Sequence, residues 1–251
     1  MIARTLDVFV EGHPPSQGGN DTRWKQAVAA KVESVWGGHG YLREDYGIDL
    51  TFFLSSTLFK STCVYNLLKP TIDGMSSVLF APVYRGKRSV WDREDWRIRE
   101  LRARKCDSPG RLGVRIRGGS PTGSLGYARA NLLRSCFMGG KPPIFAGSVP
   151  LQPWSQRLRE VLGLVGRVDP SGYIAVALAF RLPPESPGLE SDLDNYCITV
   201  GLGVARAVFD GPNPGSRIID LHARRVTVPS AEQGVQVSVY RCSRELTGLH
   251  K

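Results

Sequence analysis

The chain has 251 residues, of which 41% are hydrophobic and 22% charged, and this composition is that of a globular protein with room for two small domains. The net charge is +10, and residues 85–117 supply +7 of it with twelve Lys/Arg against five Asp/Glu, which points to a polyanionic partner such as nucleic acid. Five scattered cysteines without a C-x-x-C pair argue against a disulfide framework or a structural zinc site. We find no signal peptide and no apolar run near the ~20 residues of a membrane helix, so we expect a cytoplasmic protein without a membrane partner.

The first half of the chain predicts an alternation of strands and helices. A short apolar strand ends at a Gly/Pro turn, an amphipathic helix ends at Gly37-Gly38, and a later pair of segments alternates polar and apolar residues. The expected elements are strand 6–10, helix 22–36, strand 48–54, helix 64–80, and strands 96–105 and 112–117. Residues 118–141 are rich in Gly and Ser at both ends and predict a linker with a short helix around 128–137.

The second half repeats this plan. Gly12, Pro15 and Gln17 match Gly147, Pro150 and Gln152, and a Trp-x-Gln helix start follows in each case. The expected elements are strand 144–146, helix 154–165, strand 173–181, helix 193–209, and strands 217–227 and 234–240. A repeat of this length means two domains rather than a solenoid. We therefore predict an α/β (α+β) protein of two domains, each a small mixed sheet with two helices, at 1–117 and 142–251.

Asp192, Asp194 and Asn195 form a D-x-D-N motif at the start of the predicted helix 193–209. In an extended segment alternate side chains point the same way, so both carboxylates can face one point. With a third carboxylate they would suit Mg²⁺, or Mn²⁺ in its place. The same two residues also suit a helix N-cap and first turn without any metal.

The order of a Gly-x-x-Pro strand, a Trp-bearing helix, D-x-D-N at a helix start and a strand ending in basic residues resembles the RusA-type Holliday junction resolvases. This resemblance implies a small, Mg²⁺-dependent α/β endonuclease that acts as a dimer on four-way junctions, so a tandem repeat would form an intramolecular pseudo-dimer. The family pattern also contains a lysine three residues after the Asn, a later aspartate, and an acidic pair shortly before an Ile.

These family positions are divided between the halves. The second half has D-x-D-N, but Ile198 and Leu202 stand at the lysine and later aspartate, and Pro214 and Gly215 at the acidic pair. The first half has the complementary set, with Cys63 and Tyr65 in place of the two D-x-D carboxylates; the residues that it keeps are Asn66, Lys69, Asp73, Glu94 and Asp95.

Three interpretations remain. In the first, which we favour, the second half is active and Asp210 supplies the third carboxylate beside Asp192 and Asp194. In the second, the two half-sets, including Lys69, Glu94 and Asp95, meet at the domain interface and form one composite site, which requires a particular docking geometry. In the third, the protein binds branched or double-stranded DNA without cleaving it. A protein that binds no nucleic acid is a further alternative.

The expected phosphate contacts are basic residues of the last strands of each half. Only some of the basic residues in the first half have a basic residue at the equivalent position in the second half. The expected contacts are Arg97, Arg99, Arg102, Arg104, Lys105, Arg217, Arg224 and Arg225.

Overall fold

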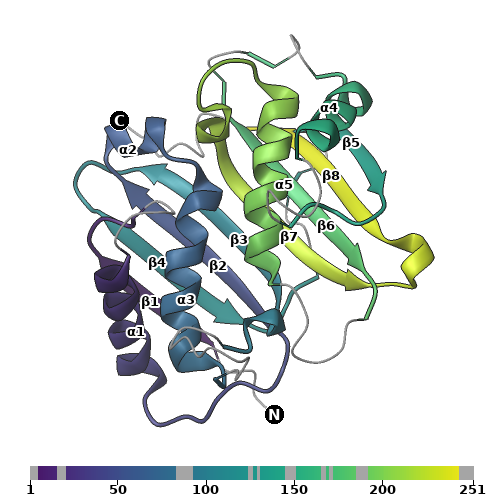
Figure 1. The fold of residues 1–251 in the computed structure, drawn as a ribbon. Helices are drawn as coiled ribbons and strands as arrows, with labels where there is room; N and C mark the ends of the chain where they lie inside the picture. The colour runs from purple at the N-terminus through teal and green to yellow at the C-terminus, as the bar shows by residue number, and fades with distance from the viewer. Residues whose placement is uncertain are drawn as a thin grey trace.

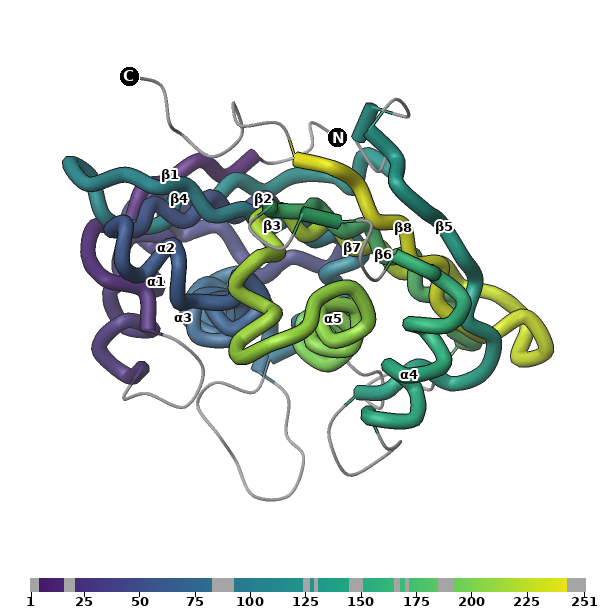
Figure 2. The backbone as a smooth tube through the Cα atoms, turned by 90° about the horizontal axis from the view of Figure 1, so that it is seen from above, coloured from purple at the N-terminus to yellow at the C-terminus, as the bar shows by residue number. Residues whose placement is uncertain are grey.

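The computed structural model describes residues 5–15, 21–82, 93–123, 127–128, 131–144, 151–164, 168–169, 172–184 and 192–242. In this part of the chain eight strands form one mixed sheet in the order β1-β4-β2-β3-β7-β6-β8-β5. The pairs β2–β3 and β6–β7 are parallel, and the other neighbours are antiparallel. Helices α1, α3, α5 and α4 lie along one face of the sheet (Figures 1 and 2). The predicted mixed α/β class is therefore confirmed.

The first half follows the predicted order of its main strands and helices. It contains β1 (Leu6–Glu11), α1 (Thr22–Trp36), β2 (Tyr46–Leu54), α2 (Ser56–Ser61), η1 (Val64–Leu67), α3 (Leu68–Leu79), η2 (Asp95–Arg97), β3 (Ile98–Asp107) and β4 (Gly113–Gly119). The short helix α2 and the 3₁₀ turn η2 are additional to the predicted elements. The helix predicted over 64–80 is divided into the 3₁₀ turn η1 and the α-helix α3. Pro70 lies in the first turn of α3, where a missing N–H costs no intrahelical hydrogen bond, so the α-helix tolerates it.

The second half differs from the prediction at its first strand. It contains β5 (Leu132–Gly139), α4 (Leu151–Leu162), β6 (Ile174–Leu182), α5 (Leu193–Val208), η4 (Pro214–Arg217), β7 (Ile218–Thr227), η5 (Ser230–Glu232) and β8 (Gly234–Arg241). The strand expected at 144–146 is not seen at Ile144, and 145–146 lie outside the described residues. Instead β5 occupies the segment predicted as a linker with a short helix. It is an edge strand that pairs only with β8, and its mostly exposed side chains give it little hydrophobic signal.

The strand order repeats between the halves. β1-β4-β2-β3 in the first half corresponds to β5-β8-β6-β7 in the second, and the two sets join where β3 and β7 pair antiparallel from Glu100↔Arg224 to Arg104↔Asp220. The sheet therefore runs without a break from one half into the other (Figure 1).

The main core lies between the sheet and its helices. Alternate residues of each inner strand point to the helices, as Leu50 and Phe52 of β2 and Leu101 and Ala103 of β3 do, and all of these are fully buried. Helices α3 and α5 run side by side over the middle of the sheet (Figure 2). Most residues of α5 are buried, as expected for a helix that is apolar nearly all round. Polar residues at the start of α5 are consequently held close to α3.

Candidate acidic site between the two halves

The D-x-D-N motif lies where α5 begins. Asp192 is the N-cap residue with extended backbone, but its side chain makes no capping hydrogen bond to the helix. It accepts instead from Asn195 Nδ2 at 3.3 Å. Asp194 lies in the first turn and is only 2% exposed. Simple capping therefore does not account for the motif, because the Asp192 carboxylate makes no capping bond and the Asp194 carboxylate, which accepts from Asn195 N, is buried.

The first half contributes the other members of the cluster. Lys69 and Asp73 lie on α3, and Lys69 Nζ is 2.9 Å from Asp73 Oδ1 and 3.6 Å from Asp194 Oδ2. Asp95, on η2, is 5% exposed and makes a side-chain hydrogen bond with Asp192. The two half-sets thus meet between α3 and the start of α5. This is the composite arrangement, which the sequence alone did not favour because it could not supply the docking geometry.

Lys25 of α1 is a member that sequence reasoning missed. Its Nζ lies 2.9 Å from Asp73 Oδ2 and 3.2 Å from Asp21 Oδ2. Lys25 therefore fixes one Asp73 oxygen while Lys69 takes the other. The only sequence signal was its place next to Trp24 in the repeated Trp-x-Gln motif, since Ser155 stands there in the second half. We use the name acidic centre for Asp73, Asp95, Asp192 and Asp194 with Lys25 and Lys69.

Two carboxyl groups of the acidic centre, those of Asp95 and Asp194, are costly to ionise. Burial, and then the negative charges of Asp192 and Asp194, raise the pKa of Asp95 well above its ordinary value, while Lys69 opposes this. Burial also raises the pKa of Asp194 to about 6, against the opposing effect of Lys69. The pKa of Lys69 is raised, because Asp194 and Asp73 outweigh its burial. Lys69 therefore stays charged, and a bound cation would favour the ionised forms of Asp95 and Asp194.

Asp194 also has a buried acceptor, the oxygen that faces Lys69 Nζ at 3.6 Å. Its Oδ2 is buried and has no hydrogen-bond partner among the described residues, a state that is costly for a polar atom. Carboxylate oxygens are the ligands that Mg²⁺ and Mn²⁺ prefer, so the donor set fits such an ion in its chemistry. No group of three or more His, Cys, Asp or Glu side chains in the described part of the chain is already arranged around a metal position.

Two predicted acidic ligands lie outside the cluster. Asp210 follows the C-terminal end of α5, roughly 24 Å along the helix from its start. Its side chain is 70% exposed and pairs with Arg159 at 3.0 Å. Glu94 precedes Asp95 but pairs with Arg97 at 2.8 Å and is 26% exposed. The structure therefore does not bring Asp210 to Asp194, since a whole helix separates the two residues, and of the acidic pair Asp95 joins the cluster.

Lys105, a predicted phosphate contact, is buried in the structure. It is 1% exposed, and its ammonium donates to the carbonyl oxygens of Phe59, Thr62 and Ser216. It points to the helix side of β3, with Leu101 and Ala103, because residues two apart share a face of a strand. Burial lowers the pKa of Lys105 to about 7. The run of basic residues at the end of β3 had suggested that all of their side chains face solvent, but Lys105 lies on the face of the strand that the helices cover.

The other predicted phosphate contacts are largely engaged within the protein. Arg102 makes a bidentate pair with Asp220, at 3.2 and 2.7 Å. Other partners within the protein hold most of the rest: Arg97 with Glu94, Arg99 with Asp45, Arg104 with Asp49, Arg224 with Gly123 O, and Arg217 over the Phe209 ring. Arg225 is half-buried on β7. The basic residues 85, 87 and 88 and Trp91 lie outside the described residues.

A cavity of about 450 Å³ opens on the face of the sheet opposite the helices. Its lining includes Arg102, and Glu100, whose Oε1 lies 3.1 Å from His222 Nε2 across the β3–β7 pair. Glu100 also accepts from Thr122 N and Gly123 N. The charged groups at this face thus pair with one another and join the two halves.

Comparison of the chain with protein-family models, with curated proteins and with solved structures finds no match in any of the three. Among the helices of the described residues, none has the length and hydropathy needed to cross a membrane.

Proposed function

We propose that this protein is a divalent-metal-dependent endonuclease of branched DNA, such as four-way junctions, whose acidic centre is built by both halves of the chain. One observation carries the proposal: Asp192 and Asp194 of the second half meet Lys69, Asp73 and Asp95 of the first, around a buried carboxylate oxygen without a hydrogen-bond partner. Buried and mutually perturbed ionisable groups are typical of functional sites.

Each member of the centre has a role in this proposal. Asp95, Asp192 and Asp194 would hold Mg²⁺ or Mn²⁺, which when bound activates water and offsets negative charge on a phosphodiester. Lys69 would supply a fixed positive charge next to the phosphate, since its partners keep it protonated. Lys25 acts through Asp73 and is a positioning residue. Asp95 and Asp194 would bind the ion in their ionised forms, so metal affinity should rise with pH until both carboxyl groups are ionised.

The net charge of +10 supports a nucleic-acid partner. Arg97 is the predicted phosphate contact closest in sequence to Asp95, and both belong to η2. Contacts of this kind release counterions, so binding should weaken steeply with added salt.

The test uses a labelled four-way junction with Mg²⁺ or Mn²⁺ and the full chain. Asp194→Asn should reduce cleavage about 100-fold or more and leave junction binding unchanged. Asp210→Asn is the matched control, because it makes the same chemical change at an exposed carboxylate away from the centre, and it should cleave like the wild type. A wild-type protein that cleaves no branched DNA with either metal, or an equal loss in the two variants, would contradict the proposal.

A second candidate function is binding of branched DNA without cleavage. The ion pair of Lys69 with Asp194 favours it, because the lysine already neutralises part of the charge that a metal would neutralise. A junction that is bound and never cut would support this alternative. The absence of any DNA binding at low salt would contradict both functions.

A further inference from the structure

The repeat defines a second position equivalent to the acidic centre. In the acidic centre Asp192 and Asp194, at the start of α5, meet Asp95 ahead of β3. The equivalent residues at the start of η1 are Cys63 and Tyr65, and they meet Gly215 ahead of β7. We call this place the counterpart position.

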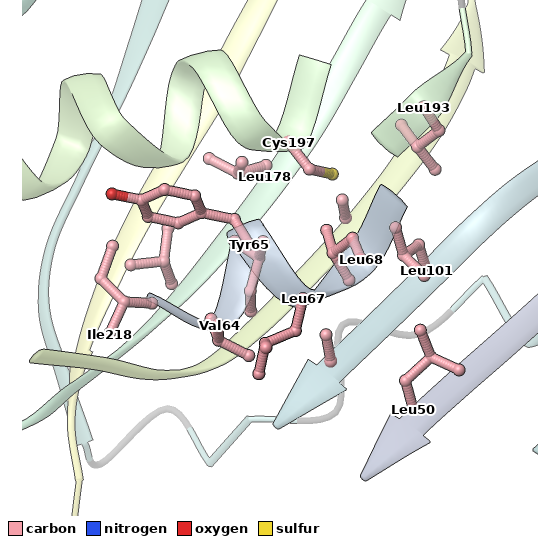
Figure 3. Packing of buried hydrophobic residues seen from close by; sticks show 14 of the residues in the cluster. Leu50, Val64, Tyr65, Leu67, Leu68, Leu101, Leu178, Leu193, Cys197 and Ile218 are labelled. Carbon is pink, nitrogen blue, oxygen red and sulfur yellow. The ribbon is translucent and has the colours of Figure 1, made fainter. Parts of the chain in front are cut away.

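The counterpart position is filled by side chains. Tyr65 is 2% exposed and lies in the buried cluster with Cys197 of α5 and Ile218 of β7 (Figure 3). Two glycines make room for it: a Cβ at Gly201 would lie 2.9 Å from Tyr65 Cδ1, and a Cβ at Gly215 would overlap Tyr65 Oη. An acidic residue at position 215 would therefore have no space while Tyr65 is in place.

The counterpart position also lacks the carboxylates of the acidic centre, and the ammonium beside it, that of Lys105, is held by the carbonyl oxygens of Phe59, Thr62 and Ser216. Burial raises the pKa values of Cys63 and Tyr65 above their ordinary values, so both stay neutral near pH 7. On α5, Ile198 and Leu202 stand where α3 has Lys69 and Asp73. None of the four residues at the counterpart position, Cys63, Tyr65, Ile198 and Leu202, offers a carboxylate to a divalent metal or a positive charge to a phosphate.

We propose that one chain makes a single incision in a branched DNA and is a nicking enzyme, because its counterpart position is closed. This inference rests on the proposed function and specifies its product. In the incision a water oxygen forms a bond to one backbone phosphorus, the bond from that phosphorus to a sugar oxygen breaks, and the two protons of the water pass to the departing sugar oxygen and to the surrounding solution. The other strands of the junction stay intact.

The experiment uses a supercoiled plasmid whose inverted repeat extrudes a four-way cruciform. A single cut releases the supercoiling and gives an open circle, whereas two cuts in opposite strands during one binding event give a linear molecule. With Mg²⁺ the wild type should give open circles as the first product. Linear molecules formed at the same initial rate would overturn the inference and leave the proposed function standing, whereas a plasmid that stays supercoiled would contradict the proposed function itself.

Substitutions at the two equivalent positions provide a second test. Asp194→Asn should abolish nicking, while Tyr65→Phe, which keeps the ring and removes only a buried hydroxyl, should nick at the wild-type rate. A synthetic junction gives the same distinction without supercoiling. When each of its strands is labelled in turn and cleavage is followed under single-turnover conditions, only one strand per junction should be cut. A loss of cleavage in Tyr65→Phe with unchanged folding, or paired cuts within one junction, would overturn the inference.

Discussion

Asp194 is the residue through which pH should act on this protein. Its side chain is almost fully buried, and its pKa is raised to about 6. A carboxyl whose pKa is higher in the folded than in the unfolded state stabilises the fold below its unfolded pKa, and that stabilisation is lost as pH rises through the folded pKa. The stability cost therefore develops between pH ~4 and 6, and the ionised form needed for the proposed chemistry appears over the same range.

We predict that cleavage decreases as pH falls below about 6 and that Asp194→Asn is more stable than the wild type at pH 8, by about 1–3 kcal/mol, because the amide stays neutral. At pH 4 the two proteins should have nearly equal free energies of unfolding. Denaturant unfolding at both pH values measures this difference. A cleavage rate that is flat from pH 5 to pH 8 would contradict the assignment.

Lys105 illustrates a charged residue used for structure. Its three acceptors come from α2, from the end of that helix and from η4, so the ammonium links the two halves. We predict that Lys105→Met lowers the free energy of unfolding by about 2–4 kcal/mol, since three buried carbonyl groups lose their donor. Arg104→Met is the control: its pair with Asp49 is half-exposed, so less than about 1 kcal/mol should be lost. If instead Lys105→Met weakens DNA binding and leaves stability unchanged, the structural role is wrong.

At the scale of elements, η4 can approach η1 closely because position 215 has no side chain. We predict that Gly215→Ala destabilises the protein by about 1–3 kcal/mol, because the added methyl group meets Cys63 Sγ and Tyr65 Oη. Adding Tyr65→Phe should recover part of this loss by removing one of the two clashing atoms. Gly110→Ala, with open space around the new Cβ, should change stability by no more than about 0.5 kcal/mol. Equal effects of the two alanines in thermal unfolding would contradict the close packing.

The elements themselves were mostly predictable. The helix predicted at 22–36 has those bounds in the structure, and the starts of α5 and β8 were correct, because these segments combine clear periodicity with turn or capping residues. The edge strand β5 was missed, since Gly139 and Gly140 resemble a linker and one neighbour imposes little hydrophobic pattern. Pairing with β8, which is distant in sequence, determines its conformation.

At the scale of the whole molecule, the acidic centre depends on how the halves dock. Asp95 and Asp194 are ninety-nine positions apart in the chain, and each was named from a local motif. Their meeting follows from the antiparallel β3–β7 pair, which sets α3 beside α5, and local sequence patterns contain no information on that pairing. The burial of Lys105 could not be predicted for a similar reason. A run of charged residues at the end of a strand does not show which face of that strand the helices will cover.

Because β3 and β7 belong to one chain, the assembly of the acidic centre does not depend on protein concentration. A centre completed by two separate subunits disappears when dilution dissociates them, because association depends on the concentration of free protein. Here both contributors are covalently joined, so each faces an effective concentration of its partner that dilution does not change. The protein can thus keep one open centre and one closed counterpart in a constant one-to-one ratio, which a mixture of exchangeable subunits could not maintain.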